Sequence, residues 1–149
     1  MSGPVLAVDP GSDKCGLAVV APNGAIIALA VVRTAQVQAQ AEVMLIEHVP
    51  AFFIVGDGTW SRKVRPALEQ ALARARAAAP QVTLPASLQS TSERHTTERA
   101  RQEYFKANPP RGLWRLVPLG LQVPSVPIDD YAAAVMAMDF LKSLPSPPR

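Results

Sequence analysis

Three short apolar runs near the N-terminus, joined by tight turns, most constrain the fold of this chain. Each run contains β-branched residues, which favour strands. Asn23-Gly24, between the second and third runs, is a strong hairpin signal because both positions tolerate positive φ. The sequence therefore predicts three consecutive antiparallel strands, at Val5–Val8, Gly16–Val20 and Ala25–Val32.

Helical and strand patterns alternate after this opening. Phe52–Val55 is an unbroken apolar run, as expected for a central parallel strand. The other predicted elements are helices at Ala35–His48, at Ser61–Ala79, from Thr96 or Thr97 to about Lys106 and from Asp130 to about Leu144, a strand at Val82–Leu84, and a long loop or short strand at Arg111–Pro127. An antiparallel meander followed by helix–strand alternation predicts an α/β fold, with a mixed five-stranded sheet covered by helices on both faces.

Proline and polar residues mark the predicted helix ends. Ser61 and Asp129 are suited to cap the helices that follow them, and Pro66 is expected to delay the regular start of the helix after Ser61. A length of 149 residues suits one domain, over residues 1–144, followed by a frayed Pro-rich tail at 145–149.

Composition narrows the possible chemistry and location. Cys15 is the single cysteine, which excludes an intrachain disulfide and a zinc site built on several thiolates. The sequence has neither a secretory signal pattern nor an apolar stretch of ~20 residues, so we expect a cytoplasmic protein with no membrane segment.

Positive charge is concentrated in the middle of the chain. From Trp60 to Arg115 there are eleven Lys or Arg residues and four Asp or Glu residues, although the whole chain has a net charge of only +3. Such a segment suits a polyanionic partner, because contacts of Lys and Arg with phosphates dominate affinity for nucleic acid. Charge alone leaves open the simpler interpretation that these residues only solubilise helices.

Asp9 is the first candidate for a catalytic side chain. It ends the first predicted strand, at a turn made by Pro10-Gly11, where α/β proteins commonly display ligand-binding groups. Asp-Pro-Gly is also an ordinary turn sequence, so Asp9 gains meaning only if Glu93 and Asp129 reach the same edge of the sheet. Asp57, between two glycines after the Phe52–Val55 strand, is a secondary candidate. A cluster of three acids would suit Mg²⁺ or Mn²⁺.

Four segments, in order along the chain, resemble the YqgF family (also called RuvX) of the RNase H-like superfamily, whose members are related to the RuvC resolvases. Ser92-Glu93-Arg94-His95-Thr96-Thr97 resembles the family motif Asp-Glu-Arg-Leu-Thr-Thr and is the most specific match. The other segments are Val8-Asp9-Pro10-Gly11-Ser12 through Val19, Phe53-Ile54-Val55-Gly56, and Asp129-Asp130-Tyr131-Ala132-Ala133, which resembles a closing Asp-x-x-Ala-Ala motif.

The resemblance implies an RNase H-like nuclease that processes pre-16S rRNA or cleaves Holliday junctions. It assigns Asp9, Glu93 and Asp129 as catalytic acids that bind two Mg²⁺ or Mn²⁺ ions, with Asp130 as a secondary metal ligand. The residues expected to bind RNA, or branched or single-stranded DNA, are Arg62, Lys63, Arg94, Arg101 and Trp60. The choice between RNA and DNA, and between a monomer and a homodimer, stays open at this point.

Two departures from the family motif suggest different substrate contacts. Ser92 replaces the usual acid and His95 replaces a leucine. These changes keep open a non-catalytic RNase H-like module that only binds nucleic acid. A second alternative is an ATP-binding protein of the actin and sugar-kinase superfamily, which begins with a similar hairpin but needs two such domains.

Overall fold

The computed structural model describes residues 3–92, 96–109 and 129–145. Its strands are β1 (Val5–Asp9), β2 (Lys14–Val20), β3 (Ile26–Arg33), β4 (Phe52–Gly56) and β5 (Leu88–Thr91). Its helices are α1 (Val37–His48), α2 (Ser61–Ala78), α3 (Thr96–Ala107) and α4 (Asp129–Ser143), with a short 3-10 turn, η1 (Thr34–Gln36), before α1. No helix in these ranges combines the length and apolarity needed to cross a membrane.

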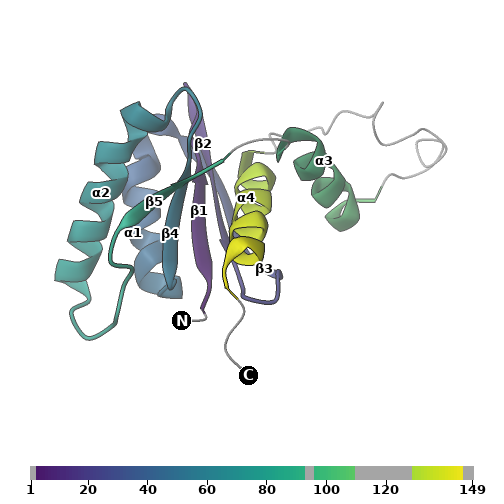
Figure 1. The fold of residues 1–149 in the computed structure, drawn as a ribbon. Coiled ribbons are helices and arrows are strands. Elements are labelled where there is room, and N and C mark those ends of the chain that lie inside the picture. The colour runs from purple at the N-terminus through teal and green to yellow at the C-terminus, as the bar shows by residue number, and fades with distance from the viewer. Residues whose placement is uncertain (1–2, 93–95, 110–128, 146–149) are drawn as a thin grey trace.

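The five strands form one mixed sheet in the order β3-β2-β1-β4-β5. β1 pairs antiparallel with β2, and β2 with β3, whereas β4 pairs in parallel with both β1 and β5. Helices α1 and α2 cover one face, and α4 covers the other with α3 packed beside it (Figure 1). The predicted mixed sheet with helices on both faces is confirmed.

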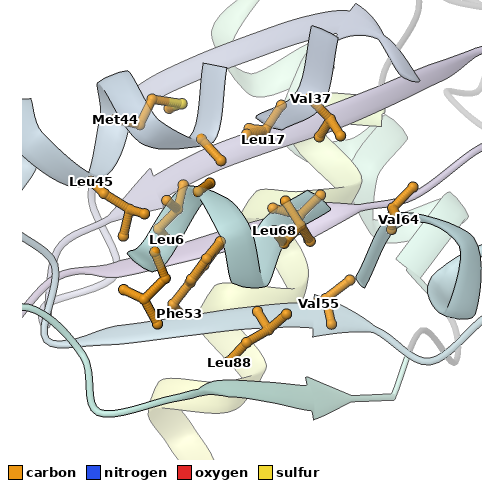
Figure 2. Close-up of a cluster of buried hydrophobic side chains, with 14 of the residues drawn as sticks. Leu6, Leu17, Val37, Met44, Leu45, Phe53, Val55, Val64, Leu68 and Leu88 are labelled. Carbon is orange, nitrogen blue, oxygen red and sulfur yellow. The ribbon is translucent and has the colours of Figure 1, made fainter. Parts of the chain in front are cut away.

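Alternation along β1 divides the core into two layers. Leu6 and Val8 belong to a cluster with residues of α1 and α2, whereas Val5 and Ala7 belong to a second cluster with residues of α4. Figure 2 shows the first cluster, in which large side chains such as Phe53 fill the space between the sheet and the two helices. Because successive side chains of a strand point to opposite faces, each face of β1 carries its own core.

The predicted strand at Val82–Leu84 is wrong, and the fifth strand is β5, at Leu88–Thr91. Val-Thr-Leu has the higher strand propensity, but Pro85, which follows it directly, has no backbone N–H for a ladder. β5 is a polar edge strand with one buried side chain, Leu88, and it is held mainly by pairing with β4.

The predicted hairpin is present, with a different turn. Among the described non-glycine residues only Val49 has positive φ, so Asn23 does not use the left-handed region. Gly24 does, at φ +89°, and its N–H donates to the Ala21 carbonyl. The Asn23 side-chain oxygen accepts a hydrogen bond from the Ala25 N–H. The hairpin therefore needs one glycine and one side-chain contact.

Two helix starts and one predicted cap differ from the predictions. The segment from Ala35 begins as η1, and α1 proper begins at Val37. Ser61 is the first residue of α2 and does not cap it, and Pro66 lies inside the regular helix. A proline in the second turn removes a single hydrogen bond, which a helix of 18 residues tolerates. α4 begins at Asp129, one residue earlier than predicted. Residues 111–127 and 146–149, predicted as a loop and a tail, lie outside the described ranges.

Replacement of Leu68 by alanine tests the larger core layer. Leu68 of α2 is fully buried in that layer, so Leu68→Ala should lower the free energy of unfolding by about 2–5 kcal/mol, measured by urea denaturation. Ile27→Ala, at a side chain that is 48% exposed on β3, should change it by less than about 1 kcal/mol. Equal losses for the two variants would contradict the described packing.

Candidate active site

Asp9 is the last residue of β1 and is half-buried at the carboxyl end of the strand. By alternation it lies on the same face as Val5 and Ala7, which is the face covered by α4. The turn after Asp9 is tied to the end of β3, because the Thr34 hydroxyl donates to the Gly11 carbonyl at 2.9 Å. The backbone of Asp9 is therefore fixed by the strand before it and by the tied turn after it.

The start of α4 lies directly against the neighbouring strand. Gly16 of β2 is the register partner of Asp9. A Cβ atom added to Gly16 would lie 2.0 Å from the Asp129 carbonyl oxygen and 2.5 Å from the Asp130 nitrogen, distances that real Cβ atoms do not show. Glycine is therefore required here, and the Asp129–Asp130 peptide is held next to Asp9.

Asp129 and Asp130 form the first turn of α4, and both are half-buried. Burial raises the pKa of the Asp130 carboxyl, backbone N–H groups of Tyr131 and Asp130 oppose this change, and the charge of Asp129 adds to it. The Tyr131 N–H donates to Asp130 Oδ1 at 2.9 Å. Negative charge is thus unfavourable at this position, and a nearby cation would relieve the cost.

Helix α3 braces the start of α4. The Tyr104 and Tyr131 rings meet edge to face with centroids 5.6 Å apart. One turn from the other end of α4, Arg99 Nη1 lies 2.6 Å from both carboxylate oxygens of Asp139, so Asp139 is paired with α3 and is not part of the acidic site. These contacts fix the helix that carries the two aspartates.

Glu93, the third predicted acid, lies outside the described residues, as do Arg94 and His95. The strand before it, β5, ends at Thr91, which is the register partner of Gly56 at the carboxyl end of β4. Within residues 3–92, 96–109 and 129–145 no group of three or more His, Cys, Asp or Glu side chains is arranged to hold a metal ion. The three-acid site therefore stays a prediction that depends on Glu93.

A hollow of about 770 Å³ lies on the α2 side of the same sheet edge. Its lining includes Asp57, Thr59, Ser61, Arg62, Arg65 and Ser90. Asp57 is exposed, and its N–H donates to the Thr91 carbonyl at 2.8 Å. The secondary candidate Asp57 thus lies with the start of α2, whereas Asp9 faces α4.

The predicted nucleic-acid-binding residues fall into two places. Trp60, Arg62 and Lys63 are exposed together at the start of α2, with the Lys63 ammonium 5.3 Å from the centre of the Trp60 ring. Arg101 is half-buried in α3, on the opposite face of the sheet. Sequence reasoning missed Arg65, whose guanidinium donates to Ser90 Oγ and to the Leu88 carbonyl, each at 2.8 Å. Only its spacing from Glu69 could have drawn attention to it.

The fold is similar to that of a Thermus thermophilus RuvC structure, with a TM-score of 0.55 and 17% sequence identity over 91% of each chain. A structure of T. thermophilus RuvC in complex with a Holliday junction substrate matches with a TM-score of 0.49 and 16% identity, again over 91% of each chain. No known protein family and no curated protein matched the sequence. The predicted RNase H-like fold is confirmed. Identity this low establishes the fold alone, so chemistry has to be argued from the residues.

Substitution of Gly16 tests the contact that holds the α4 start beside Asp9. Gly16→Ala should lower the free energy of unfolding by about 3 kcal/mol, because the new methyl group would overlap the backbone of Asp129. Gly24→Ala is a matched control: its Cβ would meet nothing within 4 Å, so only the strain of positive φ remains, about 1 kcal/mol. A smaller loss for Gly16→Ala than for Gly24→Ala in urea denaturation would contradict the contact.

The raised pKa of Asp130 predicts a pH-dependent gain in stability for Asp130→Asn. A carboxyl whose pKa is higher in the folded than in the unfolded state makes stability fall as pH rises between those two pKa values. Asparagine stays neutral and keeps the oxygen that accepts the Tyr131 N–H. Without metal ions, Asp130→Asn should therefore have a higher melting temperature than the wild type at pH 7, and the difference in melting temperature should be smaller at pH 3.

The exposed Asp13 provides the control for this comparison. Asp13→Asn should leave the melting temperature within error of the wild type at both pH values. A destabilised Asp130→Asn protein at pH 7 would show that the negative charge of Asp130 is favourable in the fold.

Proposed function

We propose that this chain is a divalent-metal-dependent nuclease of the YqgF type, which hydrolyses phosphodiester bonds in nucleic acid. The observation that carries the proposal is the close approach of the Asp129–Asp130 peptide to Gly16, the register partner of Asp9. Two acidic segments from opposite ends of the chain thereby meet at the carboxyl edge of one sheet. If Asp9-Pro10-Gly11 served only as a turn, the start of α4 would not need to lie beside it.

The chemistry of the acidic groups supports a hard divalent cation. Asp9, Asp129 and Asp130 offer carboxylate oxygens, which Mg²⁺ and Mn²⁺ prefer over nitrogen or sulfur ligands. Burial raises the pKa of Asp130, and the neighbouring Asp129 charge adds to this effect, so a bound cation would offset a cost built into the fold. In the proposal Glu93, two residues after β5, supplies the further carboxylate.

Each group has a distinct task in the proposed reaction. Asp9, Glu93 and Asp129 would hold Mg²⁺ or Mn²⁺, and Asp130 would serve as an additional ligand. When bound, a pair of such ions activates a water molecule and stabilises the leaving oxygen of the phosphodiester. Arg62 and Lys63, exposed at the start of α2, would contact backbone phosphates on the same edge.

Substrate preference is supported by one motif resemblance. One of the two T. thermophilus RuvC structures is a complex with a Holliday junction substrate, but at 16% identity this likeness does not carry the substrate over to the present chain. The resemblance of residues 92–101 to the YqgF motif favours processing of an rRNA precursor. Both substrates therefore belong in the assay, and the proposal covers hydrolysis of nucleic acid by either route.

Metal-dependent cleavage tests the proposal directly. Labelled RNA and four-way junction DNA are incubated with Mn²⁺ and, separately, with excess EDTA, which should abolish cleavage. Asp9→Asn, Glu93→Gln and Asp129→Asn should each lower the cleavage rate about a hundredfold or more, because each removes a charged metal ligand. Binding of Mn²⁺, followed by calorimetry, should weaken in the same variants.

Asp13→Asn is the matched control, since it removes an exposed acid from the same turn as Asp9. It should cleave at the wild-type rate. Wild-type cleavage by both Asp9→Asn and Glu93→Gln would overturn the nuclease assignment. Tight RNA binding without metal-dependent turnover in the wild-type protein would favour the non-catalytic binding module.

A further inference from the structure

The start of α2 combines several groups that suit an anion. α2 follows β4, the parallel neighbour of β1, so its N-terminus lies at the same sheet edge as Asp9. The residue before the helix, Trp60, makes no side-chain capping hydrogen bond, and the first turn contains no acidic residue. The positive end of the helix dipole therefore faces the hollow of about 770 Å³ without a charge partner of its own.

Ser61 is the observation that distinguishes this helix start from an ordinary one. It lines the hollow, yet only 9% of the residue is exposed. No group among the described residues forms a hydrogen bond with its hydroxyl. The hydroxyl oxygen is not among the fully buried unpartnered polar atoms of the described residues, so it keeps access to the hollow and can donate its proton to a ligand there.

One backbone donor of the first turn is also available. The Ser61 N–H donates to the Gly58 carbonyl at 3.1 Å, and the N–H groups of Lys63 and Val64 both donate to the Trp60 carbonyl. The Arg62 N–H has no acceptor among the described residues. An available N–H next to an available hydroxyl, at a helix N-terminus, is the arrangement by which proteins bind phosphate.

The charges around the hollow favour the same kind of ligand. Arg62 and Arg65 line it together with one carboxylate, Asp57. Arg65 is paired with Glu69 at 3.2 Å, so Arg62 is the lining cation that is available to a ligand. Arg65 is held in place by Ser90 and by the Leu88 carbonyl, which fixes one wall. Arg62 is exposed and makes no ion pair within the described part of the chain, so its guanidinium can turn toward an anion.

We propose that this hollow binds one phosphate group, through the Ser61 hydroxyl, the Arg62 N–H and the Arg62 guanidinium. The identification of that phosphate as part of a nucleic-acid backbone rests on the proposed nuclease function. Trp60, 36% exposed beside the site, is placed to stack on the adjoining base. The site would fix the position of the strand relative to Asp9, so the Ser61 and Arg62 groups are positioning groups.

Amide NMR of the full chain in EDTA tests the site without any contribution from bound metal. Inorganic phosphate and, separately, a single-stranded oligonucleotide are titrated while the Arg62 amide signal is followed. Both should shift that signal, whereas sodium chloride at equal ionic strength should not. Ser61→Ala and Arg62→Gln should each weaken oligonucleotide binding about tenfold, since each removes a hydrogen bond to a charged group.

Two further variants separate the proposed role from general effects. Ser61→Thr keeps the hydroxyl and should retain wild-type affinity, which a purely steric role of Ser61 would not predict. Arg74→Gln removes the same charge from the same helix, away from the hollow, and should change affinity less than about twofold. Melting temperatures confirm that each variant is folded.

The outcomes distinguish this proposal from the proposed nuclease function. An unchanged Arg62 signal with both ligands, or wild-type affinity in Ser61→Ala, would overturn the phosphate site. A response to inorganic phosphate but not to the oligonucleotide would overturn its assignment to a nucleic-acid backbone. Oligonucleotide binding that depends on Ser61 and Arg62, in a protein with no metal-dependent cleavage, would support the site while the nuclease proposal fails.

Discussion

The close approach of α4 to Gly16 is the contact on which the rest of the structure depends. With no side chain at this position, the first turn of α4 lies against β2, and the helix continues across β1 and β2 on small residues. Ala133, Ala134 and Ala137 of α4 pack against a cluster that includes Ala7 and Ala18. Small side chains on both surfaces allow short backbone separations, so the same packing that builds this core also fixes the two aspartates next to Asp9.

The opposite face of the sheet is built from larger side chains and carries the basic residues of α2. Leu6, Phe53 and Leu68 separate α1 and α2 from the strands. Because β4 and β5 run parallel to β1, their carboxyl ends and the start of α2 reach the same edge as Asp9. Parallel pairing thus brings the basic residues at the start of α2, from the middle of the sequence, to the same edge as acidic residues from its two ends.

Sequence patterns predicted the fold where burial decides it and failed where backbone pairing decides it. Alternation and apolar runs identified β1, β2, β3 and β4 to within one or two residues. Sequence patterns did not predict β5, because its residues are mostly polar. Its position follows from hydrogen bonds to β4 and from the Arg65 side chain. Asp9 and Asp129 could be selected from motifs. The need for glycine at position 16 could not, since it arises from a helix encoded far along the chain.

The acidic α4 side and the positive α2 side of this sheet edge act differently on a phosphate group. A half-buried pair of aspartates repels a phosphate as long as no cation is bound, and the raised pKa of Asp130 is a sign of the same unfavourable negative potential. The positive start of α2 attracts a phosphate whether or not a cation is bound. In the proposed enzyme, nucleic acid would therefore dock on the α2 side without metal ions, and the acidic side would accept the scissile phosphate only with them. Binding and turnover would then depend on different residues, which is the property that separates a nuclease of this architecture from a module that only binds.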